Sequence, residues 1–329
     1  MKKVIFSGIQ PSAQAPHIGN YLGALRQWVD LQNDYQAYYC VVDLHAITVP
    51  QEKKKLNESI YATYAMLLSV GLDPNLSNIF VQSHVRQHTE LTWILNCFTH
   101  VGELNRMTQF KEKSTKQSQI ISAGLYDYPV LMAVDILLYH TNIIPVGEDQ
   151  VQHIELARDI AERFNNACGD VFTLPQAKIV KETARIMSLI DPTSKMSKSD
   201  TNRSATIFLT DKSDSIRKKI MSAVTDSKKI IEFDKTRLGL YNLLSIYKAI
   251  TNKTEKDITN HFVGKGYKEF KNELSEVLIE LLKPIQKKYN EYMADKTVLE
   301  IYMRQNAHKA TQVAEQTVNR VKEKLGFII

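Results

Sequence analysis

The stretch that decides the fold runs from Lys3 to Asn20 and reads KVIFSGIQPSAQAPHIGN. Its apolar run at 3–8 predicts a short strand that ends in a Gly-Ile-Gln-Pro turn. From residue 19 onward, leucine and valine recur at helical spacing, which predicts a helix directly after the loop. A strand, a loop and a helix in this order are typical of an open α/β sheet, which binds its ligand beside such a loop.

The same alternation continues through the first part of the chain. The patterns predict further strands at 37–47, 78–83 and 142–146, and helices at 53–70, 91–98 and 151–165. Strands that alternate with helices indicate a Rossmann-like, doubly wound parallel sheet. A mostly helical insertion is expected at about 100–140.

Beyond residue 205 the pattern is almost entirely helical. Helices are predicted at 240–250, 269–288 and 307–325, and Pro284 is expected to break or kink the second of them. We therefore expect two domains in the 329 residues, a Rossmann-like α/β domain at 1–205 and an all-α domain at 206–329.

Composition excludes several classes of protein. No stretch reaches the 18 or more apolar residues of a membrane span, and the apolar run behind Lys2 and Lys3 is too short for a signal peptide. Cys40, Cys97 and Cys168 form no CxxC pair, which argues against a disulfide framework or a cysteine-rich metal site. We expect a soluble cytoplasmic protein without a structural metal.

Charge is distributed unevenly along the chain. Residues 206–329 hold 23 Lys and Arg against 16 Asp and Glu, whereas residues 1–205 hold 19 against 20. A near-neutral N-terminal part and a basic C-terminal part are expected when the first binds small molecules and the second binds a polyanion. Solvated helix surface explains the same balance equally well.

Two short segments carry candidate chemistry. HIGN at 17–20 could direct donors at phosphate oxygens from the start of a helix, although a histidine there is more often a cap or a surface residue. KMSKS at 195–199 places two lysines around a serine and forms a flexible cationic clamp that suits a leaving pyrophosphate. The alternative for KMSKS is an ordinary surface loop.

The two segments resemble the HIGH and KMSKS signatures of class I aminoacyl-tRNA synthetases. Longer blocks make the chain similar to the bacterial-type tryptophanyl-tRNA synthetases, and the similarity runs nearly from end to end. These blocks are FSGIQPS (6–12), NYLGALRQW (20–28), MTQFKEK (107–113), DYPVLMAVDILLY (127–139), PVGEDQVQHIELARDIAERFN (145–165), MSLIDPTSKMSKSD (187–200) and AVTDS (223–227).

The resemblance implies a reaction in two steps. The tryptophan carboxylate attacks the α-phosphate of ATP, giving tryptophanyl-adenylate and pyrophosphate, and the tryptophanyl group then passes to the terminal adenosine of its tRNA. ATP is a substrate here and carries Mg²⁺ with it. Neither step needs a strong protein base, so positioning and charge stabilisation should dominate.

The resemblance also implies which residues handle ATP. The catalytic group would comprise His17, Asn20, Lys113, Lys195 and Lys198. The ATP site would be lined by Gln10, Pro11, Ser12, Gly19, Asn20, Gly147, Glu148, Asp149, Ile186, Lys195, Met196, Ser197, Lys198 and Ser199.

Asp135 stands in an otherwise apolar helical stretch, PVLMAVDILLY at 129–139, where an unpartnered charge is costly. It could simply pair with an internal donor. The resemblance instead makes it the acceptor for the indole N–H, and sites built around such a bond discriminate by about 10⁴–10⁵ without editing. An editing domain is therefore not expected. The residues implied to contact tryptophan are Phe6, Gly8, His45, Tyr128, Met132, Asp135, Val146 and Gln150, and for Met132 and Val146 core packing is an equal alternative.

The chain departs from the family pattern at one place. Ala13-Gln14-Ala15-Pro16-His17 replaces a glycine and a shorter link. Alanine cannot adopt positive φ as readily as glycine, and Pro16 stiffens the loop. We expect a different backbone path there, which makes Pro11 and Ser12 less secure as ATP contacts than Asn20.

The resemblance further implies two macromolecular partners. The basic helical tail would hold the anticodon stem of tRNA(Trp) through phosphate contacts and base stacking. Lys287, Lys288 and Arg304 are candidates for these contacts and are equally interpreted as solvated helix faces. A homodimer formed through the helical insertion is implied as well.

Three other functions compete with this one. A tyrosine-specific relative would share the fold and signatures, but the long blocks around Asp135 and Asp149 favour tryptophan. A catalytically silent RNA-binding paralogue would not need Lys195 and Lys198 facing a phosphate site. A nucleotidylyltransferase of the wider HIGH group would lack a basic helical tail of this length.

Overall fold

The computed structural model describes residues 2–12, 14–107, 122–147, 150–179, 185–198, 200–228 and 230–329. A five-stranded sheet lies at its centre, with the strands in the order β3-β2-β1-β4-β5. The strands are β1 (Val4–Ile9), β2 (Gln36–Val41), β3 (Asn78–Val81), β4 (Ile143–Val146) and β5 (Gln176–Ile179). Every pairing is parallel, which confirms the predicted sheet.

The order of the strands reverses around β1. The chain moves outward from β1 through β2 to β3 on one side, and then returns to place β4 and β5 on the other. Ile5 of β1 pairs with Ile143 of β4, although 138 positions separate them. An open sheet of this kind has its ligand crevice at the carboxyl ends of the strands where the order reverses, here β1 and β4.

Alternate side chains of the central strands enter different cores. Ile5, Tyr39 and Val41 pack toward the helices α2 and α4, whereas Phe6 and Tyr38 pack toward the opposite layer. This is the period of two that a strand buried on both faces imposes. The first layer contains α1 (Ile18–Asn20), η1 (Tyr21–Leu25), α2 (Arg26–Asp34) and α4 (Lys53–Ser69). The second contains η2 (Gln82–His84), α5 (Gln87–Asn96), α6 (Val101–Asn105), α8 (Ala123–Leu137) and α9 (Val151–Cys168).

Several elements differ from the sequence prediction, and the last helix, predicted at 307–325, begins at Thr297. The strand expected at 37–47 ends at Val41, and the short helix α3 (Asp43–Ala46) follows it. The strand stops because its pairing with β1 ends at Ile9, and the Asp43 carboxylate then accepts a bond from the Ser83 amide. The strand β5 was not predicted at all, since its described side chains are exposed and give no apolar signal.

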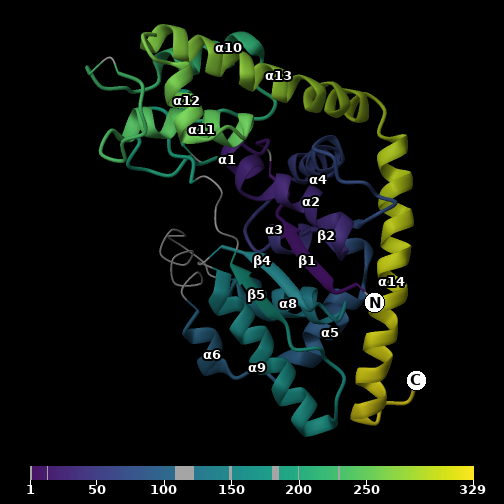
Figure 1. Cartoon of the computed structure of the whole chain (residues 1–329). Helices are drawn as coiled ribbons and strands as arrows, with labels where there is room; N and C mark the ends of the chain where they lie inside the picture. The colour runs from purple at the N-terminus through teal and green to yellow at the C-terminus, as the bar shows by residue number, and fades with distance from the viewer. Residues whose placement is uncertain are drawn as a thin grey trace.

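The C-terminal region forms a group of helices above the sheet and one long helix beside it (Figure 1). Its elements are η4 (Arg203–Ala205), α10 (Ser213–Ser222), α11 (Leu238–Thr251), α12 (Glu255–His261), α13 (Tyr267–Ala294) and α14 (Thr297–Leu325). The helix α13 continues through Pro284, so the proline does not end it. Loss of one backbone bond is tolerated there because α13 packs on α4, α10 and α11 along its length.

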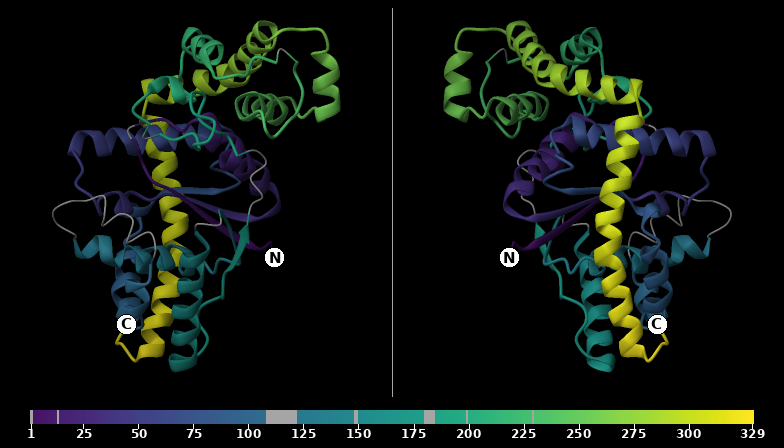
Figure 2. Two further views of the ribbon diagram at one scale, coloured as in Figure 1. Left: turned by 90° about the vertical axis from the view of Figure 1, so that its left-hand side faces the viewer. Right: turned by 90° about the vertical axis from the view of Figure 1, so that its right-hand side faces the viewer.

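The last helix returns to the first part of the chain. It runs down the length of the molecule from the upper helices (Figure 2) and packs along β3 and α5. The small side chains of Ala310 and Ala314 allow this close approach, and both are fully buried in the second core. Because α14 shares a hydrophobic core with the sheet, the domain boundary at residue 205 stays a prediction. No described helix is long and apolar enough to cross a membrane.

Candidate active site at the carboxyl ends of the strands

A cavity of about 390 Å³ opens where the strand order reverses. All eight residues that the sequence assigned to tryptophan recognition line it, and so do Gln10 and Gly147 from the ATP set. The complete lining is Phe6, Ser7, Gly8, Gln10, Trp28, Val42, His45, Tyr128, Met132, Asp135, Ile136, Ile144, Pro145, Val146, Gly147 and Gln150. A mostly apolar pocket with a few polar groups at this position suits a small aromatic ligand.

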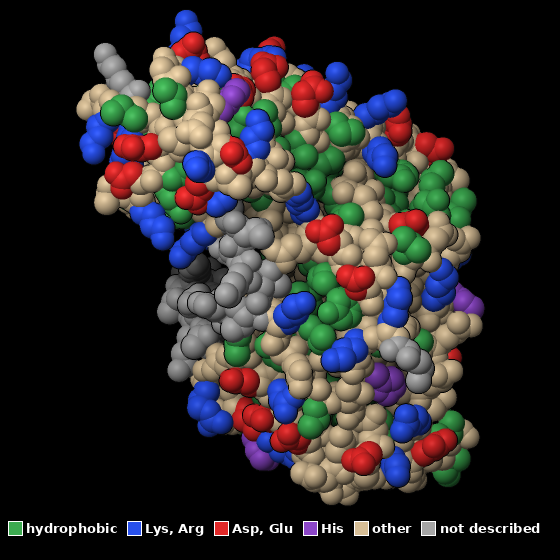
Figure 3. Space-filling view, viewed as in Figure 1, with side chains coloured by type: hydrophobic (Ala, Val, Ile, Leu, Met, Phe, Trp, Pro, Cys, Tyr) green, Lys and Arg blue, Asp and Glu red, His purple; other side chains and the backbone are tan. Residues whose placement is uncertain are grey.

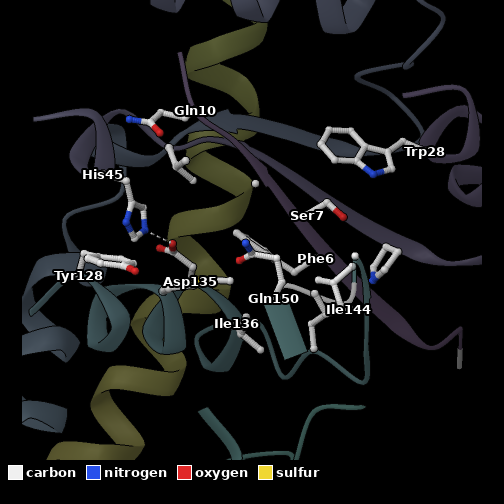
Figure 4. A pocket seen from close by; sticks show the side chains of 16 residues that line it. Phe6, Ser7, Gln10, Trp28, His45, Tyr128, Asp135, Ile136, Ile144 and Gln150 are labelled. Carbon is white, nitrogen blue, oxygen red and sulfur yellow. Dashed lines mark hydrogen bonds and ion pairs between the residues drawn. The ribbon is translucent and has the colours of Figure 1, made fainter. Parts of the chain in front are cut away.

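Asp135 is the charged centre of this cavity. It lies on α8, and His45 of α3 stands over it with the ring Nε2 at 2.8 Å from Oδ2 (Figure 4). Its other oxygen, Oδ1, accepts from Gln82 Nε2 at 2.6 Å and lies 2.7 Å from His88 Nδ1. Asp135 therefore pairs with internal donors, which was one of the two possibilities that the sequence left open. The same carboxylate also lines the pocket, which agrees with the other possibility.

The electrostatics keep Asp135 ionised. Burial alone would raise the pKa of this carboxyl, but His45 and His88 outweigh it and hold the pKa below its ordinary value. An ionised carboxylate can only accept hydrogen bonds. The pocket therefore offers a fixed acceptor to any ligand that enters with an N–H.

Sequence reasoning missed Gln82 and His88. Both lie just beyond the carboxyl end of β3, which is where functional side chains gather in a parallel sheet. This position after a predicted strand is the sequence feature that could have indicated their role. Their contact with Asp135 spans 53 and 47 positions of the chain, so no local pattern could reveal it.

Aromatic rings form the walls of the cavity. The Phe6 ring is stacked on Tyr139, with centroids 6.0 Å apart, and the Tyr128 ring meets His45 edge-on at 6.3 Å. Tyr128 and His45 lie on the side of Asp135, and Trp28 stands at the other end (Figure 4). At Gly8 a Cβ atom would lie 3.0 Å from a Val42 methyl group, so a larger residue there would crowd the pocket.

The HIGN segment forms a tightly bonded helix start. His17 caps α1, because its Nδ1 accepts from the Asn20 amide at 3.2 Å while Asn20 Oδ1 accepts from the His17 amide at 3.1 Å. The expected cap is therefore present. A Cβ at Gly19 would lie 3.0 Å from the His17 ring, which explains why glycine is needed there.

The KMSKS loop lies against this helix start. Met196 is buried, and its amide donates to Ile186 O at 3.1 Å, so the loop is anchored at its middle. Ile186 packs under Gly19. Burial, together with the charges of Lys198 and Lys195, lowers the pKa of His17 to about 4. His17 is therefore neutral near pH 7, and its Nε2 carries the hydrogen.

The structure thus brings the assigned ATP residues to two neighbouring places. His17, Gly19, Asn20, Ile186 and the loop 195–198 meet around α1. Gln10 and Gly147 stand at the aromatic cavity, and Ser12 lines a smaller pocket with Lys198. Pro11 is buried. Four assigned residues, Lys113, Glu148, Asp149 and Ser199, lie outside the described residues, as does Ala13 of the unusual loop.

Comparison with known proteins agrees with this geometry. The model of the family "tRNA synthetases class I (W and Y)" matches residues 2–283. The tryptophan–tRNA ligase of Listeria monocytogenes is 52% identical over 99% of this chain and 98% of its own. The tryptophan–tRNA ligase of Halalkalibacterium halodurans is 50% identical over 99% of this chain and 98% of its own.

Solved structures show the same relation. A tryptophanyl-tRNA synthetase from Mycoplasma pneumoniae superposes with a TM-score of 0.87 and 38% identity, covering 100% of this chain and 99% of its own. The tryptophanyl-tRNA synthetase from Campylobacter jejuni, complexed with ADP and tryptophan, superposes with a TM-score of 0.87 and 37% identity. The match covers 98% of this chain and 100% of the other. The resemblance that the sequence blocks indicated is confirmed. The chain belongs to the class I tRNA synthetases for tryptophan and tyrosine, among the bacterial tryptophan–tRNA ligases.

Proposed function

We propose that this protein activates L-tryptophan with ATP, releases pyrophosphate and transfers the tryptophanyl group to the terminal adenosine of tRNA(Trp). The observation that carries the proposal is the ionised Asp135 in an aromatic cavity that Gln10 and Gly147 of the ATP set also line. Since tRNA is a substrate, the reaction would take place in the cytoplasm.

Selection of tryptophan would rest on Asp135. The indole N–H would donate to its carboxylate, with Phe6, Met132 and Val146 around the ring. Phenylalanine has no N–H and would leave a buried, charged acceptor without that partner. Discrimination by about 10⁴–10⁵ follows from such a site without an editing step.

Adenylate formation would take place between the cavity and α1. His17 is neutral, so its Nε2–H can donate to a phosphate oxygen without competing with the lysines as a second cation. Lys195 and Lys198 would stabilise the charge that grows on the leaving pyrophosphate, and Mg²⁺ would arrive with ATP. Lys113, Glu148, Asp149 and Ser199 would complete the ATP site.

The tRNA would contact the C-terminal helices. A groove of about 670 Å³ between α2 and α11 combines aromatic and basic side chains, as RNA-binding surfaces commonly do. Its basic members are Arg26, Arg185, Lys248 and Lys253, and its aromatic members are Phe233 and Tyr241. Acidic and basic side chains are interspersed over the face in Figure 3, so a local groove is a better candidate than that whole face.

A homodimer is proposed through the layer that contains the insertion. Trp93 on α5 is 74% exposed and Val101 on α6 is 65% exposed. Exposed large apolar side chains on neighbouring helices are typical of a surface that a partner covers. The mass in solution of the wild type and of Trp93→Glu would test this: a dimer that the substitution converts to a monomer is expected.

The first test of function is amino-acid-dependent ATP–pyrophosphate exchange. We expect exchange with tryptophan and none with tyrosine or phenylalanine, followed by charging of tRNA(Trp). Exchange with tyrosine would refute the role of Asp135 and keep the class of reaction. No exchange from folded protein with any of the three would leave a silent RNA-binding paralogue as the better explanation.

A further inference from the structure

Two side chains behind the cavity hold one oxygen of Asp135. Gln82 donates to Oδ1 at 2.6 Å, and His88 Nδ1 lies 2.7 Å from the same atom. Both side chains belong to fully buried residues and neither lines the cavity. The second oxygen, Oδ2, meets only His45 in the described part of the chain, and His45 does line the cavity.

This arrangement makes the two carboxylate oxygens unequal. Each oxygen of a carboxylate has about two positions at which it accepts a hydrogen bond. Oδ1 is filled by Gln82 and His88, whereas Oδ2 keeps one position beside His45. The acceptor position that remains is therefore on the oxygen nearer the cavity.

Asp135 determines that Nδ1 of His88 carries a hydrogen, because an ionised carboxylate can only accept. The hydroxyl of Tyr139 lies 2.8 Å from His88 Nε2, and burial raises the pKa of Tyr139 well above its ordinary value. The Tyr139 hydroxyl gives Nε2 a partner of its own, so both ring nitrogens of His88 are bonded and the ring is held with Nδ1 toward Asp135. The Tyr139 ring is itself held between Phe6 and Tyr38, with centroid distances of 6.0 and 4.5 Å.

We infer that His88 is a positioning residue for substrate choice, which occupies Oδ1 of Asp135 and so presents Oδ2 to the indole N–H. This inference rests on the proposed function, in which Asp135 receives that N–H. The effect of His88 is confined to ligands that carry the N–H, because an isosteric ligand without it makes no bond to Oδ2. His88 therefore acts on discrimination rather than on general binding.

The experiment uses two amide substitutions of His88 in the full-length protein. In His88→Asn the side-chain nitrogen replaces Nδ1 and still donates to Asp135, but the bond to Tyr139 is lost. In His88→Gln the amide reaches the position of Nε2, so Tyr139 keeps a partner and Asp135 loses its donor. ATP–pyrophosphate exchange is measured with tryptophan and with β-(3-benzothienyl)alanine, in which sulfur replaces the indole N–H.

We expect kcat/KM for tryptophan to fall about 10- to 100-fold in His88→Gln, as for a lost hydrogen bond to a charged group, and far less in His88→Asn. The benzothienyl substrate should change little in either variant, and the KM for ATP should not change. Equal losses for the two substrates, or equal losses of tryptophan activity in the two variants, would show that His88 only supports packing and would overturn the inference.

Failure of the proposed function itself looks different. The wild type would then show no exchange, or no preference for tryptophan over the benzothienyl substrate. If both His88 variants misfold, Tyr139→Phe provides the test, because it keeps the stacked ring and removes only the hydroxyl. We expect a lower ratio of tryptophan to benzothienyl activity in Tyr139→Phe. An unchanged ratio would show that holding the His88 ring does not affect substrate choice and would overturn the inference.

Discussion

The indole end and the phosphate end of the site are built in opposite ways. At the indole end, one buried negative charge is surrounded by donors from His45, His88 and Gln82. At the phosphate end, two lysines approach a histidine closely enough to lower its pKa. The first end is preformed before a substrate arrives, with one acceptor position left on Oδ2 of Asp135. The second concentrates positive charge that a polyanion would stabilise.

The difference teaches what each end can contribute. A preformed acceptor makes a strong bond only with a ligand that supplies the matching donor, so it serves selection. A cluster of positive charge interacts more strongly as negative charge develops, so it serves rate. Substitutions at the two ends should therefore separate the KM for tryptophan from kcat.

The largest effect is expected for Asp135→Ala. The change removes the acceptor and leaves the donors of the buried Gln82 and His88 and of the partly buried His45 unsatisfied. Truncation of one partner of a buried, hydrogen-bonded charge pair costs about 2–5 kcal/mol of binding free energy. kcat/KM for tryptophan in ATP–pyrophosphate exchange should fall about 1,000-fold, a loss of that size. The KM for ATP should change little.

Asp127→Asn is the matched control for that substitution. Asp127 lies on the same helix α8 and accepts a bond from Asn96 at 2.8 Å, but it does not line the cavity. Its replacement should leave the selection of tryptophan over phenylalanine intact. Unchanged discrimination in Asp135→Ala would remove the basis for assigning selection to this end.

Lys195→Ala tests the phosphate end. Loss of one group that stabilises transition-state charge lowers kcat by about 100- to 1,000-fold. Single-turnover adenylate formation should slow by this amount while the affinity for tryptophan stays the same. Lys54→Ala, an exposed lysine on α4, is the control for loss of one positive charge. A normal rate of adenylate formation in Lys195→Ala would show that the loop does not act on the leaving group.

The pKa of His17 gives a pH dependence with a definite sign. Because the pKa of His17 is about 4 in the folded protein against an ordinary value of 6.5, the unfolded chain binds more protons between these limits. Stability is unaffected above pH 6.5 and decreases as the pH falls toward 4, by up to about 3 kcal/mol. His17→Asn keeps a capping acceptor for α1 and cannot titrate. Urea unfolding from pH 7 to 4 should therefore show a weaker pH dependence in this variant than in the wild type.

A larger part of the architecture than of the detailed contacts could be predicted from the sequence. Apolar strands that alternate with helices predicted the parallel sheet, and the first strand, loop and helix predicted a ligand site beside the loop after β1. The eight tryptophan-site residues came from the family resemblance, and the structure brings them into one lining. Their roles stay predictions until the exchange experiments are done.

The rest depends on contacts between distant segments. The bond between His88 and Asp135 crosses 47 positions, and β5 has exposed side chains that resemble a loop. The pattern of α14 predicts an amphipathic helix but does not identify the surface that it covers. Its alanines indicate close packing only once β3 is known to lie opposite.

The smallest effect is expected for Thr317→Val, which tests how that last helix supports the indole end. Thr317 is fully buried on α14, and its hydroxyl donates to Leu138 O at 2.8 Å, directly after α8, the helix that carries Asp135. The substitution keeps the shape and removes the hydroxyl, which also lies 3.2 Å from His140 Nε2 and from Val313 O. For loss of the bond to Leu138 the free energy of unfolding should fall by about 1 kcal/mol. The KM for tryptophan should rise slightly more than the KM for ATP, because α8 belongs to the indole end alone. Thr311→Val, on the same helix, is the control, and equal changes in the two KM values would show that α14 supports both ends alike.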